Sequence, residues 1–254
     1  MSEHHSEIFS PPPDLDIKIW RYMDFTKLVS LLENRGLFFC RLDCLGDPFE
    51  GSFTRVNEKL WQQYWTQTGQ PLTKTPLRSL LHCEPKFRAW VKDYRQRVFV
   101  NCWHMGRQES LAMWKLYSRT EEAVCIQSTF LRLRECLSGN IQTGIVRYID
   151  YDQDSIPGGN AYWAFMHKRK SFEHEQEVRA VHFPESDVQV ASKSLQGSLP
   201  KGVWQQVDLD GLIERVFVAP SAPAWFAELT KQMLTRYELR KEVQHSALDA
   251  DPFW

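Results

Sequence analysis

The sequence lacks several features that would assign the protein to a well-defined class. Its six cysteines form no Cys-x-x-Cys pair, and the closest two, Cys40 and Cys44, have no accompanying His-x-x-x-His, which argues against a structural zinc site. No apolar stretch is long enough to span a bilayer or to act as a signal peptide. We therefore expect a cytoplasmic protein with reduced thiols and no membrane contact.

Charge excess and glycine-rich loops are also missing. The formal net charge is −1, so the chain as a whole has no positive field that would attract nucleic acid or an anionic membrane. Two glycines in residues 156–160 lack the strand–turn–helix frame of a P-loop or Rossmann cradle. No Gly-x-Ser-x-Gly or His-Glu-x-x-His motif is present, and the eight histidines are scattered, so we expect no metal site.

The periodicity of the chain predicts one folded domain. Residues 1–16 are polar and proline-rich, and three consecutive prolines cannot enter a helix interior or a central strand, so this part is expected to be a disordered tail. Residues 17–254 alternate helical and strand patterns without regular βαβ spacing, and residues 54–97 look like a helical insertion. The expected class is α+β, a single domain with a central mixed, mainly antiparallel sheet flanked by helices.

The segment His167–Phe183 carries the most unusual charge pattern. Glu173, Glu175, Glu177 and Arg179 stand at every second position. On a strand, Glu175, Glu177 and Arg179 share one face, which continues into apolar residues, as in an acid–base row lining a cleft. On a helix, Glu173 and Glu177 would be like charges four residues apart, and that argument would weaken. A structural ion-pair network is an equal alternative to a functional site.

Other candidate residues each have an ordinary structural interpretation beside the functional one. Arg21 is either a ligand anchor or an ion-pair residue on a strand, and Tyr22 is either a site residue or a core aromatic. Asp47 and Glu50 flank Pro48 in a loop, where they either form a turn or contribute to a site.

The remaining candidates lie on expected helices. Met113, Trp114 and Tyr117 have the spacing of a helical core stripe, but Trp114 or Tyr117 could face a cleft instead. Lys168 and Lys170 would most simply solvate a helix end, and Lys170 is taken as a candidate ligand-binding residue.

Four ordered segments resemble the bacterial domain-of-unknown-function family 2971. They are WRYMDFTKLVSLLENRGLFFCRLDCLGDPFEG, VNCWHMGRQESLAMWKLYSR, the segment His167–Phe183, and ERVFVAP with the helix and strand that follow. Gly46 stands where the family usually has asparagine, Trp103 and His104 replace Phe and Ser, and Phe172 replaces Trp. The resemblance implies a bacterial protein but names no reaction.

The first of these segments is also similar to the start of ADP-ribosyltransferase folds. Those enzymes begin with a strand bearing Arg or His, a helix and a Gly-Leu strand, and they end with a catalytic glutamate, often in a Glu-x-Glu pair. The matching positions here are Arg21 and Glu175-Gln176-Glu177. The Ser-Thr-Ser strand of arginine-type members is not matched by residues 101–104.

This second resemblance implies an enzyme that cleaves nicotinamide adenine dinucleotide (NAD) or a related nucleotide, or transfers a group from it. NAD would be a substrate, and no cofactor would be required. Glu177, with Glu175 second, would stabilise positive charge on the ribose, and Arg21 would hold the pyrophosphate. Tyr117 or Trp114 would stack on the nicotinamide. The acceptor, a protein or a nucleic acid, stays open.

Two other interpretations remain open at this stage. The unmatched Ser-Thr-Ser strand and the many aromatic residues fit a non-catalytic ligand- or protein-binding module. Metal-dependent phosphate chemistry around Asp47, Glu50, Glu175 and Glu177 is a weaker third possibility. The enzyme hypothesis requires Arg21, Tyr117 and Glu177 to converge on one concave pocket.

Overall fold

The computed structural model describes residues 7–68, 92–118, 120–139, 141–158, 160–183 and 200–249. A nine-stranded sheet forms its centre, with the order β11-β10-β4-β1-β3-β2-β9, while β8 pairs with β3 and β5 pairs with β8. The strands are β1 (Lys18–Asp24), β2 (Gly36–Arg41), β3 (Phe99–Met105), β4 (Ala123–Thr129), β5 (Ile141–Ile145), β8 (Glu177–His182), β9 (Gly202–Gln206), β10 (Arg215–Val218) and β11 (Glu242–His245). Only β10 and β11 pair in parallel within this sheet, so the mixed, mainly antiparallel α+β fold is confirmed.

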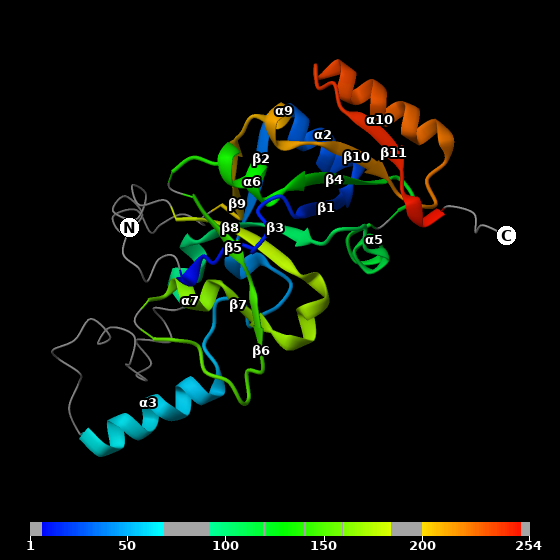
Figure 1. Cartoon of the computed structure of the whole chain (residues 1–254). Coiled ribbons are helices and arrows are strands. Elements are labelled where there is room, and N and C mark those ends of the chain that lie inside the picture. Colours follow the sequence, from blue (N-terminus) through cyan, green and yellow to red (C-terminus); the bar gives the residue numbers. More distant parts are fainter. Residues whose placement is uncertain are drawn as a thin grey trace.

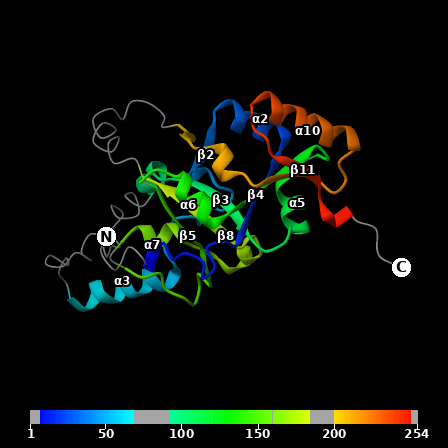
Figure 2. The ribbon, with the colours of Figure 1, turned by 45° about the horizontal axis from the view of Figure 1, so that its top comes forward.

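Helices flank the sheet, and Figures 1 and 2 place α2 and α10 at one end of the molecule and α3 at the other. The α-helices are α2 (Phe25–Glu33), α3 (Arg55–Thr68), α5 (Leu111–Tyr117), α6 (Phe130–Cys136), α7 (Tyr162–Phe165), α9 (Leu209–Leu212) and α10 (Ala224–Arg236). Short 3-10 helices are η1 (Leu42–Cys44), η3 (Arg95–Arg97), η4 (Lys170–Glu175) and η5 (Ala247–Asp249). The helical insertion expected over residues 54–97 begins with α3, and its residues 69–91 lie outside the described ranges.

The unit from β1 to β2 follows its sequence pattern closely. Leu28, Leu31 and Leu32 form the buried stripe of α2, as their spacing predicts. The left-handed residue after this helix is Arg35, with φ of 45°, and not Gly36. Gly36 is required for a different reason, because a Cβ there would lie 2.4 Å from the carbonyl oxygen of Gln205 on the neighbouring strand β9.

Strand β3 pairs with β1 at one of its ends and with β2 at the other, on the same side. β1 pairs with His104 and Met105 at one end of β3, whereas β2 pairs with Phe99 and Val100 at the other end. β8 pairs along the whole of Phe99–His104 on the opposite side. β1 and β2 therefore leave β3 from the same side, with an opening between them.

A second, two-stranded parallel ribbon supports the region below β8. It consists of β6 (Arg147–Ile149) and β7 (His167–Arg169), and η4 directly follows β7. A helix was expected over residues 160–170, but only Tyr162–Phe165 is helical and the next residues are extended. The extended segment places Lys168 inward, where it is 7% exposed.

The expectation that residues 1–16 form a disordered tail is wrong for residues 7–16. Ile8 and Phe9 are buried in a cluster with Trp163 and Phe165. The carbonyl of Ser10 accepts a hydrogen bond from the backbone of β5. The burial of Ile8 and Phe9 stabilises this segment in spite of its proline-rich composition. Residues 1–6 lie outside the described ranges. In the described part of the chain, every helix is too short or too polar to cross a membrane.

Candidate functional site

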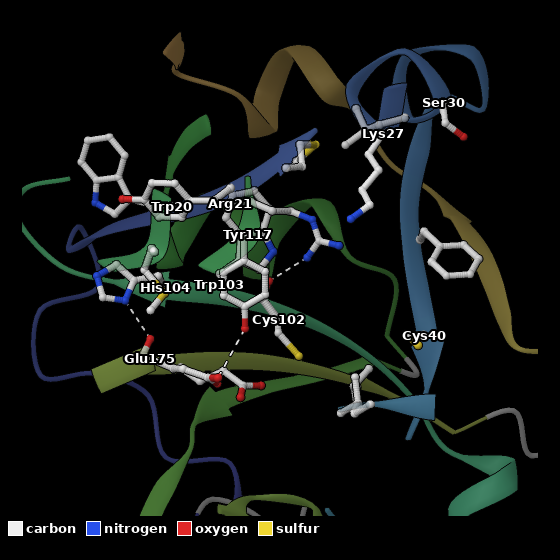
Figure 3. A pocket seen from close by; sticks show the side chains of 18 of the residues that line it. Trp20, Arg21, Lys27, Ser30, Cys40, Cys102, Trp103, His104, Tyr117 and Glu175 are labelled. Atoms are coloured by element: carbon white, nitrogen blue, oxygen red, sulfur yellow. Dashed lines mark hydrogen bonds between the residues drawn. The ribbon is translucent and has the colours of Figure 1, made fainter. Parts of the chain in front are cut away.

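The opening between β1 and β2 contains a pocket with a volume of about 590 Å³. This volume falls within the range of about 300–1000 Å³ that is usual for small-molecule sites. Arg21 on β1, Tyr117 at the end of α5 and Glu177 at the start of β8 all line it, together with Glu175 (Figure 3). The convergence that the enzyme hypothesis requires is therefore present.

One side of the pocket, the basic wall, consists of Arg21 and Lys27. The Arg21 Nη1 donates a 2.7 Å hydrogen bond to the carbonyl of Cys102, a β3 residue that faces the opening, and the guanidinium lies 5.9 Å from the Trp103 ring centroid. Among the described residues no carboxylate pairs with Arg21, and burial lowers the pKa of its guanidinium. Lys27 extends from α2 toward Arg21 (Figure 3), and its ion pair with Asp24 is long, at 3.8 Å.

The opposite side, the acid floor, is a network of three carboxylates and two cations, Glu50, Glu175, Glu177, Lys168 and Arg179. Arg179 donates to both oxygens of Glu177, at 2.6 and 2.9 Å, and to both oxygens of Glu50, at 3.0 and 3.2 Å. Lys168 lies 2.5 Å from Glu175, 3.1 Å from Glu50 and 3.4 Å from Glu177. Of these five side chains, Glu175 and Glu177 line the pocket, so its acid floor presents carboxylates to a ligand.

Burial and pairing act in opposite directions on these charges. Burial alone would raise the pKa of Glu177, but Arg179 and Lys168 lower it to about 2. Burial would lower the pKa of Arg179 and Lys168, but Glu177 and Glu50 raise both above their usual ranges. Glu177 is therefore ionised at neutral pH, and it can stabilise positive charge but cannot donate a proton.

Glu175 reaches the floor by a different backbone path from the one expected. Residues 170–175 form the 3-10 helix η4, and Gln176 has a φ of 42°, so the extended segment begins only at Glu177. The expectation that one strand carries Glu175, Glu177 and Arg179 on the same face is therefore wrong for Glu175, whereas Glu177 and Arg179 do share β8. Glu175 nevertheless meets Glu177, because both bind Lys168.

The side chains of Tyr117 and His104 also lie next to Glu175. The Tyr117 hydroxyl lies 3.4 Å from Oε1 of Glu175, and burial, followed by Glu175, raises the pKa of this tyrosine. Nδ1 of His104 lies 2.7 Å from the Glu175 carbonyl oxygen, so it carries the proton and donates. Burial lowers the pKa of His104, and the ring is neutral at pH 7. Burial, with Glu177 beside it, raises the pKa of the Cys102 thiol, which does not favour a nucleophilic cysteine.

The candidates predicted from the sequence fall into three groups. Arg21, Tyr22, Tyr117, Glu175 and Glu177 line the pocket. The Tyr22 hydroxyl, however, accepts a hydrogen bond from the backbone N–H at position 110, and its ring is buried, so its role is mainly structural.

A second group does not line the pocket. Glu50 and Arg179 are 1% and 0% exposed, and they hold Glu177 in place. Asp47 is buried and forms a bidentate pair with Arg169, at 2.7 and 3.1 Å. The equal alternative of a structural ion-pair network thus describes part of the row correctly, since Arg179 positions Glu177 and does not line the pocket.

Two candidates do not line the pocket. Trp114 is 3% exposed, donates its indole N–H to Glu109 and packs edge-on against Tyr22, so it offers no face for stacking. Lys170 is exposed at the start of η4 and does not line the pocket. The helical stripe on α5 is core at Trp114, and only Tyr117, at the helix end, reaches the cleft.

Several pocket residues were not predicted, namely Lys27, Phe38, His104 and Trp204, and neither was the role of Lys168, which binds Glu175 and Glu177 in the acid floor. Lys168 stands in a run of three basic residues that gives no reason to prefer one of them. This segment was also expected to be helical, so no strand alternation was available to place Lys168 inward. Phe38 and Trp204 come from strands whose pairing cannot be inferred from one sequence.

In the described ranges, no three His, Cys, Asp or Glu side chains lie in an arrangement that could hold a metal ion. Comparisons of the chain with models of protein families, with curated proteins and with solved structures find no match. The resemblances to family 2971 and to ADP-ribosyltransferase folds therefore stay predictions from the sequence.

Proposed function

We propose that the protein is an enzyme that cleaves NAD or a related nucleotide, or transfers ADP-ribose from it. One observation carries the proposal: a half-buried cation that has no carboxylate partner among the described residues, Arg21, and a carboxylate that is ionised at neutral pH, Glu177, line the same pocket. A ligand with an anionic group and a developing positive charge would satisfy both. We also propose that the protein is bacterial and cytoplasmic, as the sequence leads us to expect.

The chemistry that this pocket supports is departure of nicotinamide from the ribose. The bond between the ribose C1′ and the pyridinium nitrogen breaks, its electron pair leaves with nicotinamide, and positive charge develops on the ribose. Water or an acceptor nucleophile then forms a bond to C1′ and loses a proton to solvent. Glu177 stabilises the developing charge, which needs an ionised carboxylate and no proton transfer. Glu175 and Tyr117 are placed to orient the ribose hydroxyls or the acceptor.

At the other end of the ligand, the pyrophosphate would bind the basic wall. Arg21 uses one N–H to hold the Cys102 carbonyl, and its planar fork leaves further N–H groups for phosphate oxygens. Lys27 adds a second positive charge from α2. Burial lowers the pKa of Arg21, and the negative charge of a bound phosphate would raise it again.

Incubation of the purified protein with NAD and candidate acceptors tests the proposal, with products identified by mass spectrometry. We expect release of nicotinamide by the wild type and a loss of at least about 100-fold in Glu177→Gln, since the charge that stabilises the transition state is removed. Glu175→Gln should fold more readily, because Glu175 lies at the edge of the network, and it should retain partial turnover. Lys170→Gln is the matched surface control and should behave as wild type.

Two results would contradict this proposal. Absence of turnover with any acceptor or with water would remove the enzyme assignment. Full turnover by a folded Glu177→Ala variant would remove the role given to Glu177. Thermal unfolding of each variant separates loss of chemistry from loss of fold.

A second candidate, a nucleotide-binding module without catalysis, is favoured by one specific observation. Both carboxylate oxygens of Glu177 already accept hydrogen bonds from Arg179, and Lys168 contacts one of them. A carboxylate so fully engaged suits a structural role. Calorimetric titration with NAD followed by product analysis separates the two, because a module would bind NAD and return it unchanged.

A further inference from the structure

The pocket has a third side that the proposed chemistry does not use. Phe38 on β2 and Trp204 on β9 lie directly opposite each other in the strand pairing, and both line the pocket. Their ring centroids are 5.3 Å apart with an interplanar angle of 62°. We name this pair the aromatic ledge.

The ledge keeps aromatic surface available to a ligand. The two rings meet edge to face, and this arrangement leaves ring faces uncovered that a parallel stack would hide. Phe38 is 38% exposed, a large fraction for a phenylalanine on a strand of the central sheet, and Trp204 is half-buried. Aromatic surface at a pocket edge is a typical platform for a planar base.

The backbone fixes the position of the ledge. Gly202 lies two residues before Trp204 on β9, and the Phe38 ring passes over it. A Cβ at position 202 would lie 2.1 Å from Cζ of Phe38 and 2.6 Å from the carbonyl oxygen of Phe39. Glycine at this position therefore allows Phe38 to lie flat against β9 beside Trp204.

The basic wall lies between the ledge and the acid floor. Cys40, which shares the face of β2 with Phe38, lies across the pocket from Tyr117 and Glu175, and the side chains of Arg21 and Lys27 end above the space that separates them (Figure 3). The order across the pocket is aromatic surface, positive charge, then negative charge. A free phosphate or a sugar phosphate would use only part of this order.

We infer that the aromatic ledge of Phe38 and Trp204 binds the planar base of a nucleotide whose phosphate lies on Arg21 and Lys27. The substrate class is then a base-bearing nucleotide that extends from the ledge to the acid floor, and not a sugar phosphate alone. This inference deepens the proposed function and rests on it for the reaction, but base binding at the ledge has its own readout.

The test compares AMP with ribose 5-phosphate, two probes that differ only in the base. Calorimetric titration of the wild type should show tighter binding of AMP. In Trp204→Leu and in Phe38→Leu, AMP affinity should fall roughly 5- to 100-fold, the usual effect of losing a stacked base, with the affinity for ribose 5-phosphate unchanged. Trp225→Leu is the matched control, because Trp225 on α10 is 58% exposed and lies outside the pocket.

Three outcomes would overturn the inference: no AMP binding by the wild type, equal affinity of the wild type for the two probes, or an equal loss of both in the ledge variants. The two single variants protect against a folding failure in one of them. NAD turnover measured on the same proteins distinguishes the two proposals. If NAD is turned over but AMP and ribose 5-phosphate bind equally well, the inference about the ledge fails and the proposed enzyme stands. If AMP binds more tightly and this preference depends on the ledge, but NAD is not turned over, the enzyme assignment fails and the ledge stands.

Discussion

The two charged sides of the pocket differ in how their charges are compensated. In the acid floor, every charged side chain has an opposite charge within 3.4 Å. In the basic wall, Arg21 has no carboxylate partner among the described residues, and Lys27 forms one long ion pair, 3.8 Å from Asp24. Charges that neutralise one another build the pocket, and charges that are unpaired or weakly paired are available to a ligand. Arginine and lysine therefore have different functions on the two sides: in the acid floor they hold carboxylates in place, and in the basic wall they are available to a ligand.

Removal of Arg179 should break this comparison most strongly. Arg179→Leu would leave Glu50 and Glu177 buried, with Lys168 as the one cation that pairs with them among the described residues. Removing one partner of a buried ion pair costs about 3–5 kcal/mol in the free energy of unfolding. Chemical denaturation measures this loss. The control is Arg215→Leu, whose pair with Glu242 is about half exposed on each side, and there the change should stay below about 1 kcal/mol.

A loss of less than about 1 kcal/mol in Arg179→Leu would contradict the view that the floor depends on internal pairing. The floor would then be open to solvent, and the ionised state of Glu177 would need another cause.

The pH dependence of stability sharpens the same comparison. The pKa of Glu177 is lowered on folding from an ordinary value of 4.5 to about 2. A carboxyl group whose pKa is lowered contributes stability above its unfolded pKa, and this contribution is lost as the pH falls toward the folded value. We expect the free energy of unfolding to decrease between pH 4.5 and about 2, and the slope in Glu177→Gln to be shallower by one proton. Urea unfolding across this range measures both, and identical slopes in the two proteins would contradict the assignment.

On the basic wall, substitution should affect binding more than stability. Arg21→Gln keeps an N–H donor for the Cys102 carbonyl but removes the charge. Hydrogen bonds to charged groups contribute about 1.5–3 kcal/mol, so the affinity for AMP should fall roughly 10- to 150-fold. The free energy of unfolding should change by less than about 1 kcal/mol, since no buried carboxylate loses a partner. Calorimetry and denaturation give the two values.

Lys170→Gln is again the control for charge without contact. Unchanged AMP affinity in Arg21→Gln would show that the unpaired guanidinium has only a structural role at the Cys102 carbonyl. A large loss of stability would show that the basic wall is built like the acid floor, and the comparison would fail.

The sequence predicted best those features that depend on local spacing. The α+β class, the helical stripe of α2 and the Glu177–Arg179 pairing follow from periodicity, because side chains two residues apart on a strand share a face. The pocket convergence of Arg21, Tyr117 and Glu177 was also stated as a condition from sequence. The first three rest on local spacing, which a single sequence contains, whereas the convergence rests on the resemblance to ADP-ribosyltransferase folds.

The contributions that were missed depend on long-range pairing. Phe38 meets Trp204 only because β9 pairs with β2, and Lys168 reaches Glu175 only because an expected helix is a strand followed by η4. The buried residues Ile8 and Phe9 show the same limit, since composition indicated a tail and tertiary contacts decided otherwise. Nothing in local spacing distinguishes Lys168 from Lys170.

The smallest expected effect is at the edge where the floor meets solvent. Tyr117 is 43% exposed, and its hydroxyl lies 3.4 Å from Glu175, a long hydrogen bond. Tyr117→Phe should change the free energy of unfolding by less than about 1 kcal/mol and reduce NAD turnover less than tenfold, because Lys168 still holds Glu175. Tyr117→Leu removes the ring as well, so a larger loss of NAD affinity than in Tyr117→Phe would assign the ring to the ligand. Equal effects in both variants would assign the hydroxyl alone, and Tyr117 would then belong with the paired groups of the floor.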